Sequence, residues 1–143
     1  MSARILFVCS FNSARSQMAE GLARTLAAPG VEVASAGTHA TRVSPFAIEA
    51  LRERGLDISA QFSKTIAQVP GEFDYVITLC DEADRECPHL PARKQRLHWS
   101  YPDPARASGG DEAVRRAFAE VRDHLEQRLR GWLAAEGLLR QEK

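Results

Sequence analysis

Short apolar runs alternate along the chain with segments in which apolar residues recur every three or four positions. The apolar runs predict β-strands buried on both faces, because a half-exposed strand alternates apolar and polar residues. The predicted strands span residues 4–9, 31–36, 73–79 and 96–101.

The other segments predict helices. Met18, Leu22 and Leu26 lie on one face of a first helix, which Pro29-Gly30 ends. Ser44 followed by Pro45 is typical of a helix start. The predicted helices span residues 16 to about 28, 45–55, and a long last segment that begins near residue 111.

Strands that alternate with helices predict an α/β fold with a parallel sheet. We expect residues 1–143 to form a single domain in which helices flank a central four-stranded parallel sheet. In such sheets ligands bind just beyond the carboxyl ends of the strands. Cys9, Cys80 and Asp103 all lie at or just past predicted strand ends, so we expect them at one edge of the sheet.

Charge and hydropathy narrow the classes of partner. Nineteen Lys and Arg balance nineteen Asp and Glu, which gives no reason to expect nucleic acid or a membrane surface. No apolar stretch approaches the roughly 20 residues that span a bilayer, and the N-terminus does not resemble a signal peptide. We therefore expect a cytoplasmic protein. We also expect it to be a monomer.

Three cysteines are too few for the disulfide framework of a secreted domain. In a reducing compartment, cysteines are more often catalytic, redox-active or simply buried. The four histidines show no zinc-ligand spacing with the cysteines, so no zinc site is expected.

The loop after the first predicted strand indicates an oxyanion site. Its residues are mostly small or polar, so backbone N–H groups can point inward beside the positive end of the following helix. Arg15 adds a planar fork that can grip two oxygens. The expected oxyanion-binding residues are Ser10, Phe11, Asn12, Ser13, Ala14, Arg15 and Ser16.

Cys9 lies at the mouth of this loop. Cysteines near helix N-termini and cations favour the thiolate, and Ser16 can hydrogen-bond the sulfur. The alternative is a buried strand cysteine beside an unrelated surface arginine. It requires the arginine spacing, the loop composition and the helix start to coincide by chance, so we favour a nucleophile.

Cys9 to Ser16 resembles the C-x5-R-S loop of the low-molecular-weight protein tyrosine phosphatase superfamily, and the SAGT motif at 35–38 and Asp103-Pro104 follow in that family's order. The stretch VITLCDEADRECPHLP, residues 76–91, resembles the redox loop of the thioredoxin-coupled arsenate reductases in this superfamily. NSARSQMAEG and HWSYPDPA are similar to that branch as well. The resemblance covers nearly the whole chain and implies the low-molecular-weight phosphatase-like fold.

The resemblance implies reduction of arsenate to arsenite by a cysteine relay, as part of arsenic detoxification. Cys9 attacks arsenic while Arg15 clamps the oxyanion and Asp103 acts as general acid. Cys80 and then Cys87 resolve the adduct by thiol–disulfide exchange, and reduced thioredoxin supplies the electrons. Phosphate and sulfate are expected mimics of arsenate. We expect no tightly bound cofactor.

The charged segment DEADRE between Cys80 and Cys87 is expected to be a flexible, solvated loop. Asp103 has an alternative explanation, since an aspartate flanked by prolines is common in turns. His98, Trp99 and Tyr101 are assigned to packing.

Several positions depart from the reductase pattern. Ser10 and Phe11 stand where threonine and glycine are more usual, and Ala14 replaces a cysteine. The bulk of Phe11 is expected to alter access to the loop.

Some family members bind a potassium ion through positions that match Asn12, Glu20 and Ser35. Lys64 stands where the pattern has an acidic ligand. We therefore expect the Lys64 ammonium to replace the cation, with a solvated lysine as the alternative.

Two other functions remain open. One is a low-molecular-weight protein tyrosine phosphatase that cleaves phosphomonoesters through a Cys9 phosphocysteine, which needs neither Cys80 nor Cys87. Weak phosphatase activity would also be compatible with a reductase. The other is a non-catalytic oxyanion sensor. The electron donor is open too, since a glutaredoxin or a low-molecular-weight thiol can reduce a loop disulfide.

Overall fold

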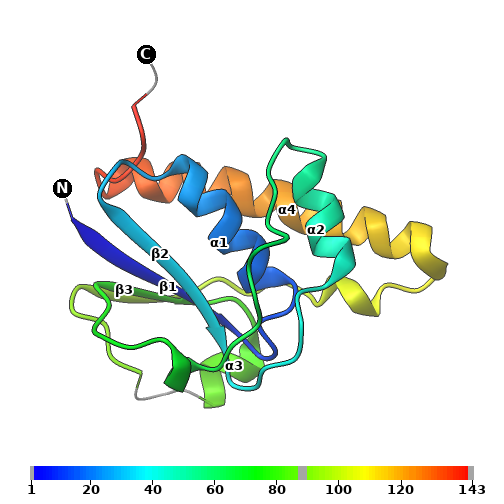
Figure 1. Cartoon of the computed structure of the whole chain (residues 1–143), viewed down its shortest axis with the longest axis horizontal. Coiled ribbons are helices and arrows are strands. Elements are labelled where there is room, and N and C mark those ends of the chain that lie inside the picture. The colour runs from blue at the N-terminus through cyan, green and yellow to red at the C-terminus, as the bar shows by residue number, and fades with distance from the viewer. Residues whose placement is uncertain (1, 87–89, 142–143) are drawn as a thin grey trace.

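A four-stranded parallel sheet forms the centre of the computed structural model, which describes residues 2–86 and 90–141 (Figure 1). The strands lie in the order β2-β1-β3-β4. Their bounds are β1 (Ala3–Cys9), β2 (Val31–Gly37), β3 (Tyr75–Thr78) and β4 (Gln95–His98). The predicted α/β fold with a central four-stranded parallel sheet is confirmed.

The α-helices are α1 (Arg15–Leu26), α2 (Pro45–Arg52), α3 (Asp81–Glu86) and α4 (Gly110–Ala135). Figure 1 shows α1, α2 and α4 together on one side of the sheet, and α3 apart from them near the ends of the strands. Two 3-10 turns, η1 (Ile66–Gln68) and η2 (Pro104–Arg106), complete the described elements. Within the described residues no helix has both the length and the apolar character needed to cross a bilayer.

The core lies between the sheet and the helices. Ile5, Leu6, Phe7 and Val8 of β1 are fully buried, as expected of a central strand covered on both faces. The buried stripe of α4 faces this core and comprises Phe118, Val121, Arg122, Leu125, Leu129 and Leu133.

The register of the sheet sets the position of the two described cysteines. Val8 pairs with Thr78 across β1 and β3, and Cys9 is the last residue of β1. Cys80 follows two residues after Thr78. Both thiols therefore lie at the carboxyl edge of the sheet, where a parallel sheet binds its ligands.

The structure differs from the sequence-based prediction between Cys80 and Cys87. Residues 81–86 form α3, where a flexible loop was expected. Ala83 is fully buried, and aspartates in the first turn favour a helix start. Most of the charged side chains of α3 are nevertheless exposed.

Candidate active site

The loop from Ser10 to Ala14 turns its carbonyl groups outward. Each carbonyl oxygen accepts a hydrogen bond from elsewhere: from His39 N–H and Thr38 Oγ1, from Ser63 Oγ, from Gln17 Nε2, from Ser44 N–H and from Met18 N–H. In the described part of the chain, the amides of residues 11–14 donate no hydrogen bond. The loop therefore presents free N–H groups on its inner side, which is the arrangement that binds an anion.

Asn12 holds the loop in this shape. It has a positive φ of 50° and is fully buried. Its Nδ2 donates to Ser16 Oγ at 2.8 Å and to Ser35 Oγ at 3.0 Å, while its Oδ1 accepts from Gln17 Nε2 at 2.9 Å and from the Lys64 N–H at 3.0 Å. A left-handed conformation is costly outside glycine, and this network of bonds stabilises it.

Gly37 allows β2 to approach the loop closely. A Cβ atom at this position would lie 2.5 Å from the His39 carbonyl oxygen, 2.8 Å from the Asn12 N and 2.9 Å from the Ser10 carbonyl oxygen. These backbone atoms have no room for a side chain. The glycine of the SAGT motif is therefore a steric requirement of the loop.

Arg15 is the first residue of α1 and is 8% exposed. Its Nη1 donates to the Tyr101 carbonyl oxygen at 2.9 Å, and its Nε is buried with no hydrogen-bond partner among the described residues. A buried donor without a partner is costly. An oxyanion in the loop would supply the acceptor, as expected for an arginine clamp.

Each of the two described thiols contacts a serine hydroxyl. Cys9 Sγ lies 2.8 Å from Ser16 Oγ, and Cys80 Sγ lies 3.3 Å from Ser10 Oγ. Both cysteines are free and buried, with exposed fractions of 2% and 1%. The hydroxyls are placed to stabilise a thiolate by donating to it.

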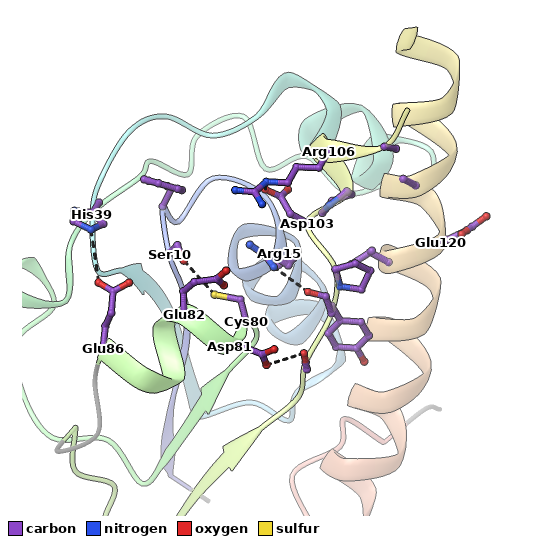
Figure 2. A pocket seen from close by; sticks show the side chains of 18 residues that line it. Ser10, Arg15, His39, Cys80, Asp81, Glu82, Glu86, Asp103, Arg106 and Glu120 are labelled. Carbon is purple, nitrogen blue, oxygen red and sulfur yellow. Dashed lines mark hydrogen bonds and ion pairs between the residues drawn. The ribbon is translucent and has the colours of Figure 1, made fainter. Parts of the chain in front are cut away.

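Two cavities meet at this edge of the sheet. The smaller one, of about 320 Å³, is lined by Cys9 and the loop. The larger one, of about 890 Å³, is lined by Cys80 and by side chains of α3 and α4 (Figure 2). Phe11, Arg15 and Asp103 line both. Phe11 is 49% exposed at this mouth, where its bulk was expected to affect access.

Asp103 lies at the start of η2. Its Oδ1 accepts from the Ala105 N–H at 3.0 Å, and its Oδ2 is 3.8 Å from Arg106 Nε. The turn interaction that offered an alternative explanation for this aspartate is therefore present. The same carboxylate also faces both cavities, beside Arg15 (Figure 2).

The residues expected to bind a cation are already bonded to one another. Ser35 Oγ donates to Glu20 Oε1 at 2.5 Å, and Arg24 lies 2.6 Å from Glu20 Oε2. Lys64 Nζ is 3.8 Å from Glu20 Oε1 and donates to the Phe62 carbonyl oxygen at 3.1 Å. Burial lowers the pKa of Lys64, while Glu20 opposes that shift. Lys64 is thus not a solvated lysine, and these residues do not fit an additional cation.

In the described ranges, no group of three or more His, Cys, Asp and Glu side chains could hold a metal ion. Cys87, the third cysteine of the expected relay, lies outside the described residues.

The sequence analysis missed a polar network beside Cys80. His98, which was assigned to packing, contacts Thr78 Oγ1 at 2.8 Å and Asp81 Oδ1 at 2.9 Å. Trp99 is buried, as packing predicts. The three polar residues in QRLH were the available signal, because a strand buried on both faces would not contain them.

Comparison with known proteins agrees with this geometry. The family model described as low molecular weight phosphotyrosine protein phosphatase matches residues 4–143. An arsenate reductase of Halalkalibacterium halodurans is 44% identical over 127 residues, which cover 88% of this chain and 91% of the relative.

Solved structures give the same result. A structure described as an arsenate reductase in the phosphate binding state has a TM-score of 0.75 and 33% identity, over 94% of this chain and 98% of the other. The thioredoxin-dependent arsenate reductase of Corynebacterium glutamicum has a TM-score of 0.70 and 31% identity, over 94% of this chain and 61% of its own. The resemblance to the arsenate reductases of this superfamily is confirmed, and the chain belongs to the low molecular weight phosphotyrosine protein phosphatase family.

Proposed function

We propose that the protein is an arsenate reductase, which converts arsenate to arsenite at the Cys9 loop. The main support is the loop itself, with its carbonyls turned outward, its amides free and the Arg15 Nε unpartnered beside a thiol. The arsenate reductases that resemble the chain over most of its length support arsenic as the reacting atom. Phosphate has the same tetrahedral shape and serves as a mimic.

The first step forms an arsenic–sulfur bond. The Cys9 thiolate, hydrogen-bonded by Ser16, attacks arsenic, and one arsenic–oxygen bond breaks. Asp103 donates a proton to the leaving oxygen, which departs as water. The free loop amides and Arg15 hold the remaining oxygens, so the charge that develops on them is stabilised in place.

The second step transfers two electrons. The Cys80 thiolate attacks Cys9 Sγ, and a disulfide forms between them. The sulfur–arsenic bond breaks, and its electron pair leaves with arsenic as arsenite. Ser10, the residue after Cys9, contacts Cys80 Sγ, which supports an approach of Cys80 to Cys9.

The third step resets the nucleophile. Cys87 attacks Cys80 Sγ and releases the Cys9 thiolate, and the dithiol of thioredoxin then reduces the Cys80–Cys87 disulfide. α3 lies between Cys80 and Cys87 in sequence, and Cα atoms joined by a disulfide are no more than about 7 Å apart. We propose that α3 unwinds when Cys80 and Cys87 bond.

The charge beside the loop is supplied from within the chain. We propose that the Lys64 ammonium, close to Glu20, does the work that a potassium ion does in some family members.

The test is arsenate-dependent oxidation of NADPH in the presence of thioredoxin and thioredoxin reductase. The wild type should turn over continuously. Cys87→Ser should stop after about one equivalent of arsenite, because it lacks the thiol that attacks Cys80 and releases Cys9. Cys9→Ser should form no arsenite and serves as the control. Rapid hydrolysis of an aryl phosphate without arsenate turnover would instead establish the phosphatase.

A further inference from the structure

Arg96 of β4 bridges the two sides of the segment that contains Cys87. Its Nη2 lies 3.1 Å from Asp84 Oδ1 and donates to the Asp84 carbonyl oxygen at 3.2 Å, on the α3 side. Its Nη1 donates to the Leu90 carbonyl oxygen at 3.2 Å, on the far side. One guanidinium therefore ties both flanks to the sheet.

His98, two residues further along β4, holds the start of α3. One ring nitrogen contacts Thr78 Oγ1 at 2.8 Å, and the other contacts Asp81 Oδ1 at 2.9 Å. Ser100 Oγ adds a bond of 3.0 Å to the same Asp81 oxygen, and Thr78 Oγ1 donates to Asp84 at 3.0 Å. We call Arg96 and His98 together the β4 clamp.

Beyond these contacts, α3 also packs against β1 and β3, and Glu86 lies 3.7 Å from His39. The helix has six residues, and Ala83 is the one buried among them. Helices of this length are unstable alone, because nucleation costs more than the few internal hydrogen bonds return. The polar contacts from β4 therefore contribute much of the stability of α3, which directly follows Cys80 in sequence.

We infer that Arg96 and His98 are positioning residues of the thiol relay: they hold α3 folded, with Cys80 beside Ser10, and their release controls the pairing of Cys80 with Cys87. The inference rests on the proposed function, because it gives the unwinding of α3 a role. The clamp retains Cys80 near the loop until Cys9 carries the adduct. Breaking it frees the segment to move.

The measurement is hydrogen exchange at the Asp84 amide, which donates to the Cys80 carbonyl oxygen at 3.2 Å. In Arg96→Met this amide should exchange about tenfold faster than in the wild type, as expected for the loss of a charged hydrogen bond. Arg93→Met is the matched control. Arg93 Nε lies 3.1 Å from Asp74 Oδ1, and this arginine should leave the Asp84 exchange unchanged.

The relay provides a second measurement. In single turnover with arsenate, Arg96→Met should form the Cys80–Cys87 disulfide faster than the wild type once Cys9 and Cys80 have paired. Alkylation of Cys9 by iodoacetamide should stay unchanged, since the clamp does not contact Cys9. A variant that was merely destabilised would show neither the faster disulfide formation nor the unchanged alkylation of Cys9.

A double-mutant cycle tests the contact itself. Asp84→Asn combined with Arg96→Met should accelerate exchange by less than the product of the two single effects, because both substitutions remove the contact between these two side chains. His98→Ala should also accelerate exchange, and it provides a second variant if Arg96→Met fails to fold.

Unchanged Asp84 exchange in Arg96→Met and His98→Ala, or equal acceleration in Arg93→Met, would overturn the clamp. If the wild type fails to reduce arsenate while Arg96→Met still accelerates exchange, the relay is wrong and the clamp on α3 stands.

Discussion

Ser10 Oγ lies 3.3 Å from Cys80 Sγ, so the loop that follows the first thiol contacts the second one directly. Ser10 comes immediately after Cys9 in sequence, whereas Cys80 belongs to the end of another strand. The residue next to Cys9 in sequence therefore contacts the thiol that is proposed to attack Cys9. This proximity suits a relay in which one sulfur attacks another.

Ser16 should control the reactivity of Cys9. In Ser16→Ala the Sγ loses a hydroxyl at 2.8 Å, and alkylation by iodoacetamide at pH 7 should slow about tenfold, the effect of losing one hydrogen bond to a charged group. Arsenate reduction should fall in parallel. The rate of iodoacetamide labelling at Cys9, followed by mass spectrometry, is the measurement.

Ser13→Ala is the control for Ser16→Ala. Ser13 belongs to the same loop, and its backbone carbonyl accepts from the Ser44 N–H. This substitution should leave labelling within about twofold of the wild type. An equal loss in both variants would show that the loop as a whole had been disturbed.

Gly37→Ala should disrupt the oxyanion loop. The new Cβ would approach three backbone atoms to less than 3.0 Å, so the loop must shift, and phosphate binding should weaken at least about tenfold. Isothermal titration with phosphate measures this. Gly131→Ala, in α4 with nothing within 4 Å of its Cβ, should bind normally and be stabilised by about 0.5–1 kcal/mol.

Lys64 should make activity independent of potassium. Wild-type arsenate reduction should proceed at the same rate in sodium and potassium buffers, because the ammonium already lies 3.8 Å from Glu20 Oε1. Lys64→Ala should lose activity in sodium and regain part of it in potassium. A wild type that potassium strongly activates would contradict the proposed role of Lys64.

Asp74 should contribute stability that is lost in acid. The backbone N–H of Arg4, 2.8 Å from Oδ2, and the nearby Arg93 keep the pKa of Asp74 below its ordinary value. A lowered folded pKa adds stability above the unfolded pKa of about 3.9, and that stability disappears as the pH falls through the folded value.

Asp74→Asn should therefore reduce the free energy of unfolding by about 1 kcal/mol at pH 7 and by progressively less as the pH falls below 4. Urea unfolding of both proteins across this pH range is the measurement. A difference that stayed constant down to pH 2 would rule out titration of Asp74 as its cause.

The fold and the oxyanion loop could be predicted from the sequence because both depend on local patterns. The apolar run before Cys9 fixes β1, and the spacing from Cys9 to Arg15 spans one strand end and one helix start. The position of Gly37 beside the loop could not be predicted from spacing alone, since it depends on the register of β1 with β2.

The helix α3 was missed for a related reason. Its sequence is short and charged, so neither length nor apolar periodicity favours a helix. The contacts that hold it come from Arg96 and His98, which follow it in sequence and reach it only after β4 pairs with β3. Such tertiary effects override local propensity.

The oxyanion loop also has a consequence for selectivity. Its backbone amides and one arginine recognise the shape and charge of a tetrahedral anion, and none of them distinguishes arsenic from phosphorus. Inorganic phosphate is therefore expected to be a competitive inhibitor that raises the apparent KM and leaves kcat unchanged. Discrimination then rests on chemistry after binding, because a thiol can take an oxygen-bound arsenic(V) to arsenic(III) and has no equivalent reaction with phosphate. Selectivity therefore comes from the reducibility of the bound anion, and phosphate can occupy the loop without reacting.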